Sequence, residues 1–292
     1  MRLRACPSTP QASLSTISRN CLRHGFTRLG IAMIESSMPS DWRDLQNRVA
    51  RILVECGFEV EVEKSIQVAR GCVEVDVHAT DRGHRPVTTY LYECKHWQRA
   101  VPKAVVHAFR TVVADYGANW GLVVSSGGFQ SGAFEAAENT NVRLVDWSEF
   151  QELYEDRWIE HCLVPRLREE AEPLVDYTEP INTRVFRKAN QFDEAHQRRF
   201  VELRELYVGI AFLALPLYLG TSTWVAKLRR PDGPLKLDLP LREVLGAHPP
   251  PGADRLPQDL LDADCLREFV DVLCRHLCEG VAAFDEVFGG RA

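Results

Sequence analysis

Residues 72–97 read CVEVDVHATDRGHRPVTTYLYECKHW, and this stretch decides how the first half of the chain is expected to fold. Apolar and polar side chains alternate over residues 72–79 and again over residues 89–97, which is the period of a half-buried β-strand. Between the two runs, residues 81–86 read DRGHRP and are rich in turn-forming types. The sequence therefore predicts a hairpin of two strands.

This hairpin also predicts which side chains meet, because successive residues of a strand point to opposite faces. The first strand is expected to turn its valines at 73, 75 and 77 to one face and its polar residues to the other, namely Glu74, Asp76 and His78. In the second strand Glu93 and Lys95 share a face, while Cys94 between them points away. Two carboxylates and an ammonium group are thus expected to converge on rigid strands.

Regular patterns on both sides of the hairpin extend it into a domain. Upstream, apolar residues at helical spacing from 42 to 56 predict an amphipathic helix that stops at Gly57, and residues 58–62 alternate as a strand. Downstream, the patterns predict a helix over 102–116, a buried strand over 120–126, a short helix over 131–140, a strand over 142–145 and a helix over 147–158. We therefore expect one α/β domain over residues 41–158.

The two ends of the chain differ from this domain in composition. Residues 1–40 contain five arginines and a single acidic residue, Glu35, as in a transit peptide or a disordered tail. Because Met33 and Met38 lie just before the first helix, we favour a disordered leader or an over-extended start. Residues 159–292 are mostly helical in pattern, with strong candidates at 194–215 and 264–287, and we expect an α-rich region whose role the sequence does not define.

One stretch of this second region reaches the length of a membrane span. Residues 207–226 are nearly free of charge. Pro216, Gly220 and the polar residues 221–223 interrupt the stretch, which favours a buried core helix over a membrane anchor.

Composition limits the classes of partner. The chain has 292 residues, 45% of them hydrophobic and 26% charged, and a formal net charge of −6, which excludes a basic nucleic-acid coat. Any phosphate-binding surface must therefore be local or be completed by bound cations. Nine cysteines without a CxxC pair argue against a disulfide framework and favour a reducing, cytoplasmic compartment. A glycine-rich phosphate loop is missing from the sequence, so we expect no nucleotide cofactor.

The residue types at the hairpin indicate a specific chemistry. Carboxylates are hard oxygen ligands that suit Mg²⁺ or Mn²⁺, so Asp76 and Glu93 are candidate metal ligands. Lys95 could orient an attacking water and stabilise the negative charge of a phosphoryl transition state. By spacing alone, however, the solvated face of a half-exposed hairpin with a cross-strand ion pair is the favoured interpretation of these residues.

A resemblance to a known family favours the functional interpretation of these residues over the solvated face. It rests on Gly57-Phe58 after the first helix, on VEVDV at 73–77, on YECK at 92–95, and on GLVVSSGGFQ at 121–130 followed by alanines at 133, 136 and 137. Residues from about 41 to 155 thereby resemble the Mrr-like restriction endonuclease family of the PD-(D/E)xK nuclease superfamily. The resemblance implies an αβββαβ core with a mixed sheet flanked by helices, DNA as substrate, Mg²⁺ as cofactor with Mn²⁺ as a substitute, and Asp76, Glu93 and Lys95 as the catalytic residues.

The sequence departs from the family pattern at one position. Many members have a glutamate in the first helix, and Gln46 stands at the matching position here. An amide is a poorer metal ligand than a carboxylate, so the number of metal ions is open, and Glu74 is a candidate for a supporting acid. Further candidates for contacts with DNA phosphates are Arg99, Lys103, Arg110, Ser125, Ser126 and Gln130, although scattered cations and turn-forming residues often have no such role.

Two other hypotheses remain beside a DNA endonuclease of restriction, defence or repair. The first is a nuclease-fold module that has lost efficient hydrolysis and holds nucleic acid or a protein partner, which Gln46 and the acidic net charge favour. The second is a nuclease anchored to a membrane through residues 207–226. A zinc site at Cys274, His276 and Cys278 is a separate candidate, but their helical spacing within an apolar run indicates core cysteines instead. Since cutting both strands of DNA usually needs two active sites, we also expect a homodimer.

Overall fold

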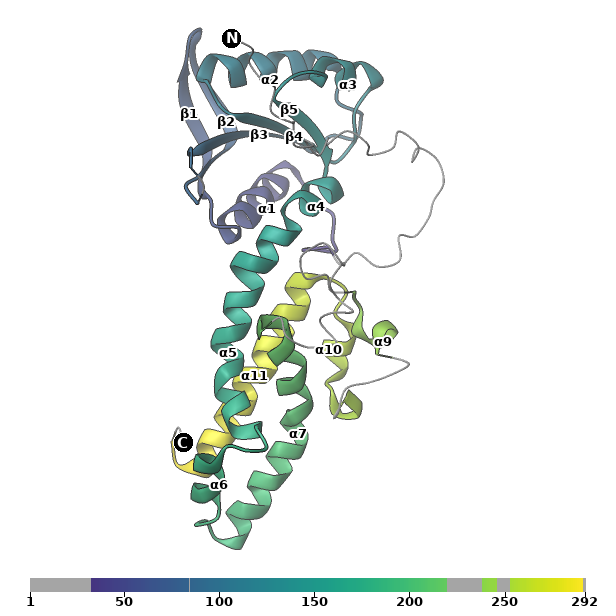
Figure 1. The fold of residues 1–292 in the computed structure, drawn as a ribbon. Coiled ribbons are helices and arrows are strands. Elements are labelled where there is room, and N and C mark those ends of the chain that lie inside the picture. Colours follow the sequence, from purple (N-terminus) through teal and green to yellow (C-terminus); the bar gives the residue numbers. More distant parts are fainter. Residues whose placement is uncertain (1–32, 84, 220–237, 246–252, 291–292) are drawn as a thin grey trace, which may run out of the picture. The chain divides into compact units, whose positions relative to one another are not determined.

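A computed structural model describes residues 33–83, 85–219, 238–245 and 253–290 (Figure 1). Five strands form one mixed sheet in the order β1-β2-β3-β4-β5. They are β1 (Glu59–Val68), β2 (Gly71–Asp81), β3 (Thr88–Lys95), β4 (Trp120–Ser125) and β5 (Val142–Asp146). The first three strands are antiparallel neighbours, whereas β4 runs parallel to both β3 and β5.

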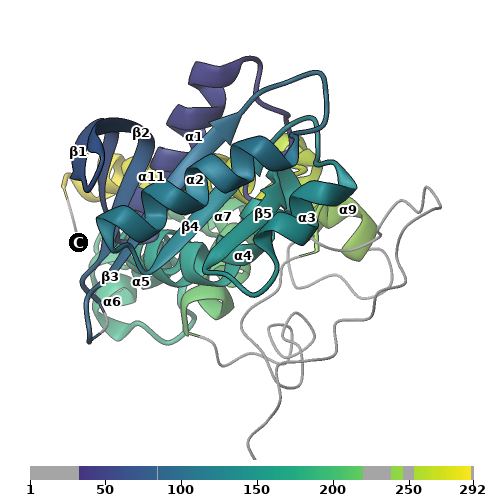
Figure 2. The same ribbon diagram turned by 90° about the horizontal axis from the view of Figure 1, so that it is seen from above.

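Helices cover both faces of this sheet (Figures 1 and 2). One face packs against α1 (Trp42–Glu55) and α4 (Trp147–Trp158), and the other against α2 (Lys103–Tyr116) and α3 (Ser131–Ala137). Strand β4 shows the alternation, because Leu122 and Val124 enter the core under α1 while Val123 enters the core under α2. The predicted α/β fold with a mixed sheet between helices is confirmed.

Local capping signals explain where the helices of the first face begin. The side chain of Asp41 accepts a hydrogen bond from the backbone N–H of Asp44 at 2.8 Å, which satisfies a free donor at the start of α1. At the start of α4, Asp146 and Glu149 form a reciprocal capping box. With this capping box, β5 ends at Asp146 and α4 begins at the next residue, Trp147. The helix therefore follows the strand without a loop between them.

The β1–β2 hairpin departs from the predicted alternation. Val77 lies in the core under α1, but Val75 lies in the core under α2, so the prediction that they share a face is wrong. The change occurs at Asp76, opposite Glu63, where the cross-strand pairing skips one residue pair. Glu63 has a positive φ of 52°, which twists the strand locally. Asp76 therefore sits at a break in the regular pattern.

The helical half of the chain continues without a linker. From α4 the helix runs through a π-helical segment, η1 (Ile159–Leu163), into α5 (Val164–Thr178). The remaining elements are α6 (Thr183–Ala189), α7 (Glu194–Leu219), α9 (Leu241–Val244), the 3-10 turn η2 (Ala253–Arg255), α10 (Gln258–Asp262) and α11 (Leu266–Phe288). Helices α5, α7 and α11 pack against one another, and α7 and α11 are the two helices that the sequence predicts most strongly.

The segment before α1 is packed where the structure describes it. Residues 1–32 of the predicted leader lie outside the described residues. Residues 33–40, which the sequence assigns to the same leader, instead contribute Ile34 to the core as a fully buried side chain. The carbonyl oxygen of Met33 accepts a hydrogen bond from the N–H of Leu266 at 2.9 Å. The folded part thus begins earlier than residue 41.

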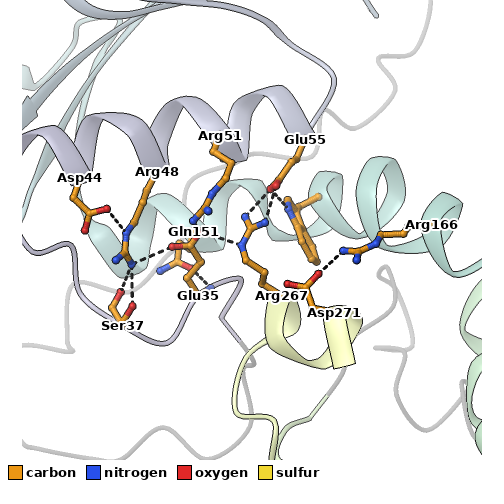
Figure 3. A network of polar contacts seen from close by, with 11 residues as sticks. Glu35, Ser37, Asp44, Arg48, Arg51, Glu55, Gln151, Arg166, Arg267 and Asp271 are labelled. Atoms are coloured by element: carbon orange, nitrogen blue, oxygen red, sulfur yellow. Dashed lines mark hydrogen bonds and ion pairs between the residues drawn. The ribbon is translucent and has the colours of Figure 1, made fainter. Parts of the chain in front are cut away.

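This segment also joins α1 to α11 through charged side chains (Figure 3). The guanidinium of Arg267, in α11, donates to both carboxylate oxygens of Glu55 at 2.6 and 2.7 Å. Its Nε lies 3.1 Å from Glu35, which also pairs with Arg48 and Arg51 of α1. These ion pairs link the first helix of the sheet region to the last helix of the chain.

The stretch proposed as a membrane-length segment is only partly described. Residues 207–219 belong to α7, and residues 220–226 lie outside the described residues. None of the helices in the described ranges has both the length and the apolar character needed to cross a bilayer.

Candidate active site

The candidate site lies where β2 and β3 part. Their ladder ends at the pair Val77–Tyr92, and Asp76, the neighbour of Val77 in the chain, lies just outside it. Beyond that pair, the Oδ2 atom of Asp76 accepts a hydrogen bond from the backbone N–H of Cys94 at 2.6 Å. The carboxylate therefore occupies the fork between the two strands, where its position is fixed by the backbone of β3.

The other two predicted residues project from β3 into the same fork. Lys95 forms an ion pair with the Oε1 atom of Glu93, and its Nζ lies 4.0 Å from Oδ2 of Asp76. The three side chains stay partly exposed, at 30% for Asp76, 24% for Glu93 and 18% for Lys95. The structure thus brings together the three residues predicted from the hairpin, at a place that solvent reaches.

Strand β3 holds Glu93 and Lys95 rigidly because it is paired with β4 along this stretch. Glu93 lies beside Val123, and Lys95 lies beside Ser125, in a parallel ladder. The N–H of Ser126 then donates to the carbonyl oxygen of Lys95 at 3.1 Å. The backbone under the candidate catalytic residues is therefore hydrogen-bonded on the β4 side up to the end of the strand.

The electrostatics of the fork favour a bound cation. Burial raises the pKa of Glu93, the ammonium of Lys95 opposes that rise, and the negative charge of Asp76 adds to it. A divalent cation at the fork would favour the charged form of Glu93 against burial and against the charge of Asp76. The donor set, two hard carboxylates open to solvent, thus fits Mg²⁺ or Mn²⁺.

Cys94 lies between the two charged residues in sequence but points to the opposite face. Its thiol is buried in the core under α1. Burial raises its pKa well above the usual range, and the nearby charges of Asp76 and Glu93 add to the rise. The thiol is therefore a core side chain and not an ionised nucleophile.

Gln46 and Glu74, the two candidates for support, occupy different environments. Gln46 is 1% exposed, and its Nε2 donates to the backbone carbonyl oxygen of Asp76 at 2.8 Å. It therefore holds the backbone of β2 at the break where Asp76 sits. Glu74 is exposed and lies opposite Ser65 of β1.

The candidate DNA contacts also separate into two groups. Ser125 is fully buried; its hydroxyl donates to the carbonyl oxygen of Gly128 at 3.1 Å and accepts from the N–H of Gly127 at 3.2 Å. It shapes the loop after β4. Arg110 donates to the carbonyl oxygen of Ala136 at 2.7 Å and so joins α2 to α3. The exposed members of the set are Arg99, Lys103 and Gln130.

Two features near the site were not anticipated as such from the sequence. His78, predicted on the same face as Asp76, is buried, and its Nε2 lies 3.1 Å from the hydroxyl of Tyr116 on α2. Trp97, just beyond β3, is 42% exposed and lies close to Lys95. Nothing in the alternation distinguishes these two aromatic residues, because both fit an ordinary strand.

The side chains considered as zinc ligands form other contacts or are buried. The ring nitrogens of His276 lie 3.0 Å from Asp259 and 3.1 Å from Glu279. Cys274 is buried, and the thiol of Cys278 lies 3.0 Å from Glu170. Cys274 is a core residue as predicted, whereas Cys278 is exposed, so the prediction that both are core cysteines is wrong for Cys278.

Comparison with known proteins assigns the sheet region to a family. Residues 38–154 match a family model described as restriction endonuclease, the Mrr catalytic domain. This segment is an Mrr-like restriction-endonuclease domain. Nucleases of this superfamily generally use divalent metal ions, and a domain of this kind implies DNA as substrate.

Comparisons with curated proteins and with solved structures do not extend this family assignment. No curated protein matches the chain. Among solved structures, a crystal structure titled as a protein of unknown function, AF1548, is 17% identical with a TM-score of 0.35. That similarity covers 62% of this chain and 96% of the other.

Proposed function

We propose that this chain is a metal-dependent endonuclease that hydrolyses phosphodiester bonds of DNA, in restriction of foreign DNA or in a related defence or repair role. The observation that carries the proposal is the convergence of Asp76, Glu93 and Lys95 in the fork between β2 and β3. The Mrr-like domain over residues 38–154 supports the reaction class.

In this proposal Asp76 and Glu93 are ligands of a divalent cation, Mg²⁺ or Mn²⁺. When bound, such a cation supplies Lewis-acid stabilisation of the charge on a phosphoryl oxygen. Lys95 plays a different part, since its ammonium orients the attacking water and stabilises the additional negative charge of the transition state. The ion pair with Glu93 keeps that ammonium at the fork before substrate arrives.

A catalytically weak module that binds nucleic acid or a protein partner is the second candidate. It is favoured by Gln46, whose amide faces the backbone of Asp76 where many family members have an acid. The net charge of −6 points the same way, because it weakens attraction to a polyanion. For the endonuclease, cleavage of both strands would require two sites, and we infer that the chain acts as a homodimer.

The test is cleavage of plasmid DNA with and without Mg²⁺ or Mn²⁺. We expect the wild-type protein to nick the plasmid only with metal, and Asp76→Ala and Lys95→Ala to lose on the order of 100-fold in rate. Glu59→Ala is the matched control, because Glu59 is an exposed acid of the same sheet and lies opposite Thr80, where β2 and β3 are still paired. Circular dichroism checks that each variant is folded.

Three outcomes separate the candidates. Metal-dependent cleavage lost in both site variants and kept in Glu59→Ala supports the endonuclease and its site. Binding without cleavage of methylated or unmethylated plasmid favours the binding module. A protein that neither binds nor cuts DNA contradicts the endonuclease, leaves only the protein-binding form of the second candidate, and directs the search to protein partners.

A further inference from the structure

Trp97 exposes a large aromatic surface directly beside the proposed catalytic residues. Its side chain is 42% exposed, whereas Trp147 and Trp158 are buried in the core. Neither of the two cores formed by the described residues includes Trp97. Burying an aromatic ring is strongly favourable, so an indole left at the surface beside a candidate active site is available for a ligand.

The segment that carries Trp97 is rigid. A side chain at Gly127 would come within 2.3 Å of the carbonyl oxygen of Trp97 and 2.9 Å of that of Arg99, so glycine permits a close approach of two backbone segments. The N–H of Val101 donates to the carbonyl oxygen of Gly128 at 2.9 Å, which fastens the same two segments further on. The indole is thereby presented by a fixed backbone and does not depend on a mobile loop.

The position of the ring limits what it can touch. The Nζ of Lys95 lies 5.9 Å from the centroid of the Trp97 ring. If Lys95 faces the scissile phosphate, the indole lies within reach of the nucleotides on either side of that phosphate. The contact must therefore involve a sugar or a base next to the cleaved bond.

Of the sugar and the base, the base is the group on which an indole can stack. In a regular duplex the faces of the bases are covered by their neighbours, so an indole can stack only on a base that has left the helical stack. Such a contact does not depend on charge, which suits a chain whose net charge of −6 weakens its overall attraction to a polyanion.

We propose that Trp97 stacks on a nucleobase unstacked beside the scissile phosphate, so that the preferred substrate is DNA with an unpaired base at the cleavage position. This inference rests on the proposed endonuclease function and names the substrate class of its site. Trp97 is in this view a residue that contacts and selects the substrate, while Asp76, Glu93 and Lys95 perform the hydrolysis.

The experiment compares kcat/KM on three oligonucleotide substrates of one sequence: a full duplex, a duplex with a single mismatch at the mapped cleavage position, and a single strand. We expect the wild type to prefer the two substrates with an unpaired base. Trp97→Ala should lose about tenfold or more on those two and less on the duplex, because stacking on one base contributes about that much affinity. Trp97→Phe should keep most of the preference.

Two controls separate a substrate contact from a structural role. Trp120→Ala removes a tryptophan that is 37% exposed at the start of β4 and packs on Arg143, and it should leave the preference unchanged. A second control moves an abasic site stepwise around the cleavage position. We expect cleavage by the wild type to be slower when the abasic site occupies one particular position. Trp97→Ala should cleave that substrate as fast as the substrate with an intact base.

The opposite results overturn the inference. They are a wild type without preference for unpaired bases, an equal loss by Trp97→Ala on all three substrates, or an abasic effect that is the same in both proteins. A wild type that cuts no DNA substrate at all contradicts the proposed function itself, which is a different and recognisable outcome.

Discussion

At the scale of single residues, Cys94 is the clearest example of a side chain whose role depends on its face. It lies between Glu93 and Lys95 in sequence, yet its thiol is 7% exposed in the core under α1. The pKa of the thiol is raised well above its usual range, first by burial and then by Asp76 and Glu93. A thiolate that could attack a phosphodiester is therefore disfavoured at any physiological pH.

We predict that Cys94→Ala keeps the metal-dependent cleavage rate and loses only about 1 kcal/mol of stability, the usual cost of a small deletion in a core. Cys72→Ala, at an exposed thiol of β2, is the control for both measurements. Plasmid cleavage and urea denaturation check the two parts. A loss of cleavage in a folded Cys94→Ala protein would assign the thiol a part in the reaction and contradict the proposed mechanism.

At the scale of elements, the sequence predicts well what short-range signals determine. The helices α1 and α4 are predicted from apolar spacing, and the structure adds caps at Asp41 and Asp146, which lie within a few residues of the turns that they stabilise. The convergence of Glu93 and Lys95 follows from strand alternation. These predictions need no knowledge of the rest of the chain.

What the sequence does not predict depends on contacts between distant segments. The break at Asp76 arises from the conformation of Glu63, thirteen positions earlier, and the alternating pattern continues through it without a signal. The rigidity of the Trp97 segment depends on Gly127, which reads locally as a turn residue. The segment around Ile34 is held by backbone hydrogen bonds to the start of α11, more than two hundred residues away. Periodicity describes neighbours in sequence and carries no information about such partners.

Gly280 provides an element-scale prediction about the helical region. A Cβ built at this position in α11 would lie 2.8 Å from a ring carbon of Tyr207 and 2.9 Å from a methyl of Leu174, so α11 meets α7 and α5 closely here. We predict that Gly280→Ala destabilises the protein by about 1–3 kcal/mol through overpacking. That loss opposes the gain in helix propensity of about 1 kcal/mol that alanine normally brings.

The control for Gly280 is Gly132 of α3. A Cβ there meets only the flexible side chain of Lys103, at 3.4 Å. Gly132→Ala should therefore be neutral or stabilising in the same urea denaturation experiment. If the two variants changed stability equally, close helix packing at Gly280 would not be the cause.

At the scale of the whole molecule, Arg267 joins parts of the chain that are far apart in sequence (Figure 3). Its guanidinium pairs with Glu55 of α1 and with Glu35, which is 5% exposed and whose N–H donates to Gln151 of α4 at 2.7 Å. The indole N–H of Trp158 also donates to Glu55, at 2.6 Å. Removing the arginine would leave two largely buried carboxylates with fewer partners.

We predict that Arg267→Ala lowers the free energy of unfolding by about 3 kcal/mol, the lower end of the range for breaking a buried ion pair, because Arg267 keeps 21% of its side chain exposed. Arg166→Ala is the matched control, since its pair with Asp271 is 45% and 53% exposed and should contribute less than about 1 kcal/mol. Denaturant titration followed by both tryptophan fluorescence and circular dichroism measures these values.

The same titration tests whether the network couples the sheet region to the helical region. In the wild type both probes should report one transition, because the ion pairs of Arg267 break only when α1 and α11 separate. In Arg267→Ala we expect the transitions to come apart, with the helical signal lost at a different denaturant concentration from the tryptophan signal. The double variant Arg267→Met with Glu55→Gln removes both charges and should recover part of the loss, since it leaves one fewer unpaired carboxylate. Coincident transitions and an unchanged midpoint in Arg267→Ala would contradict the coupling, and the two regions would then be held together by their apolar contacts alone.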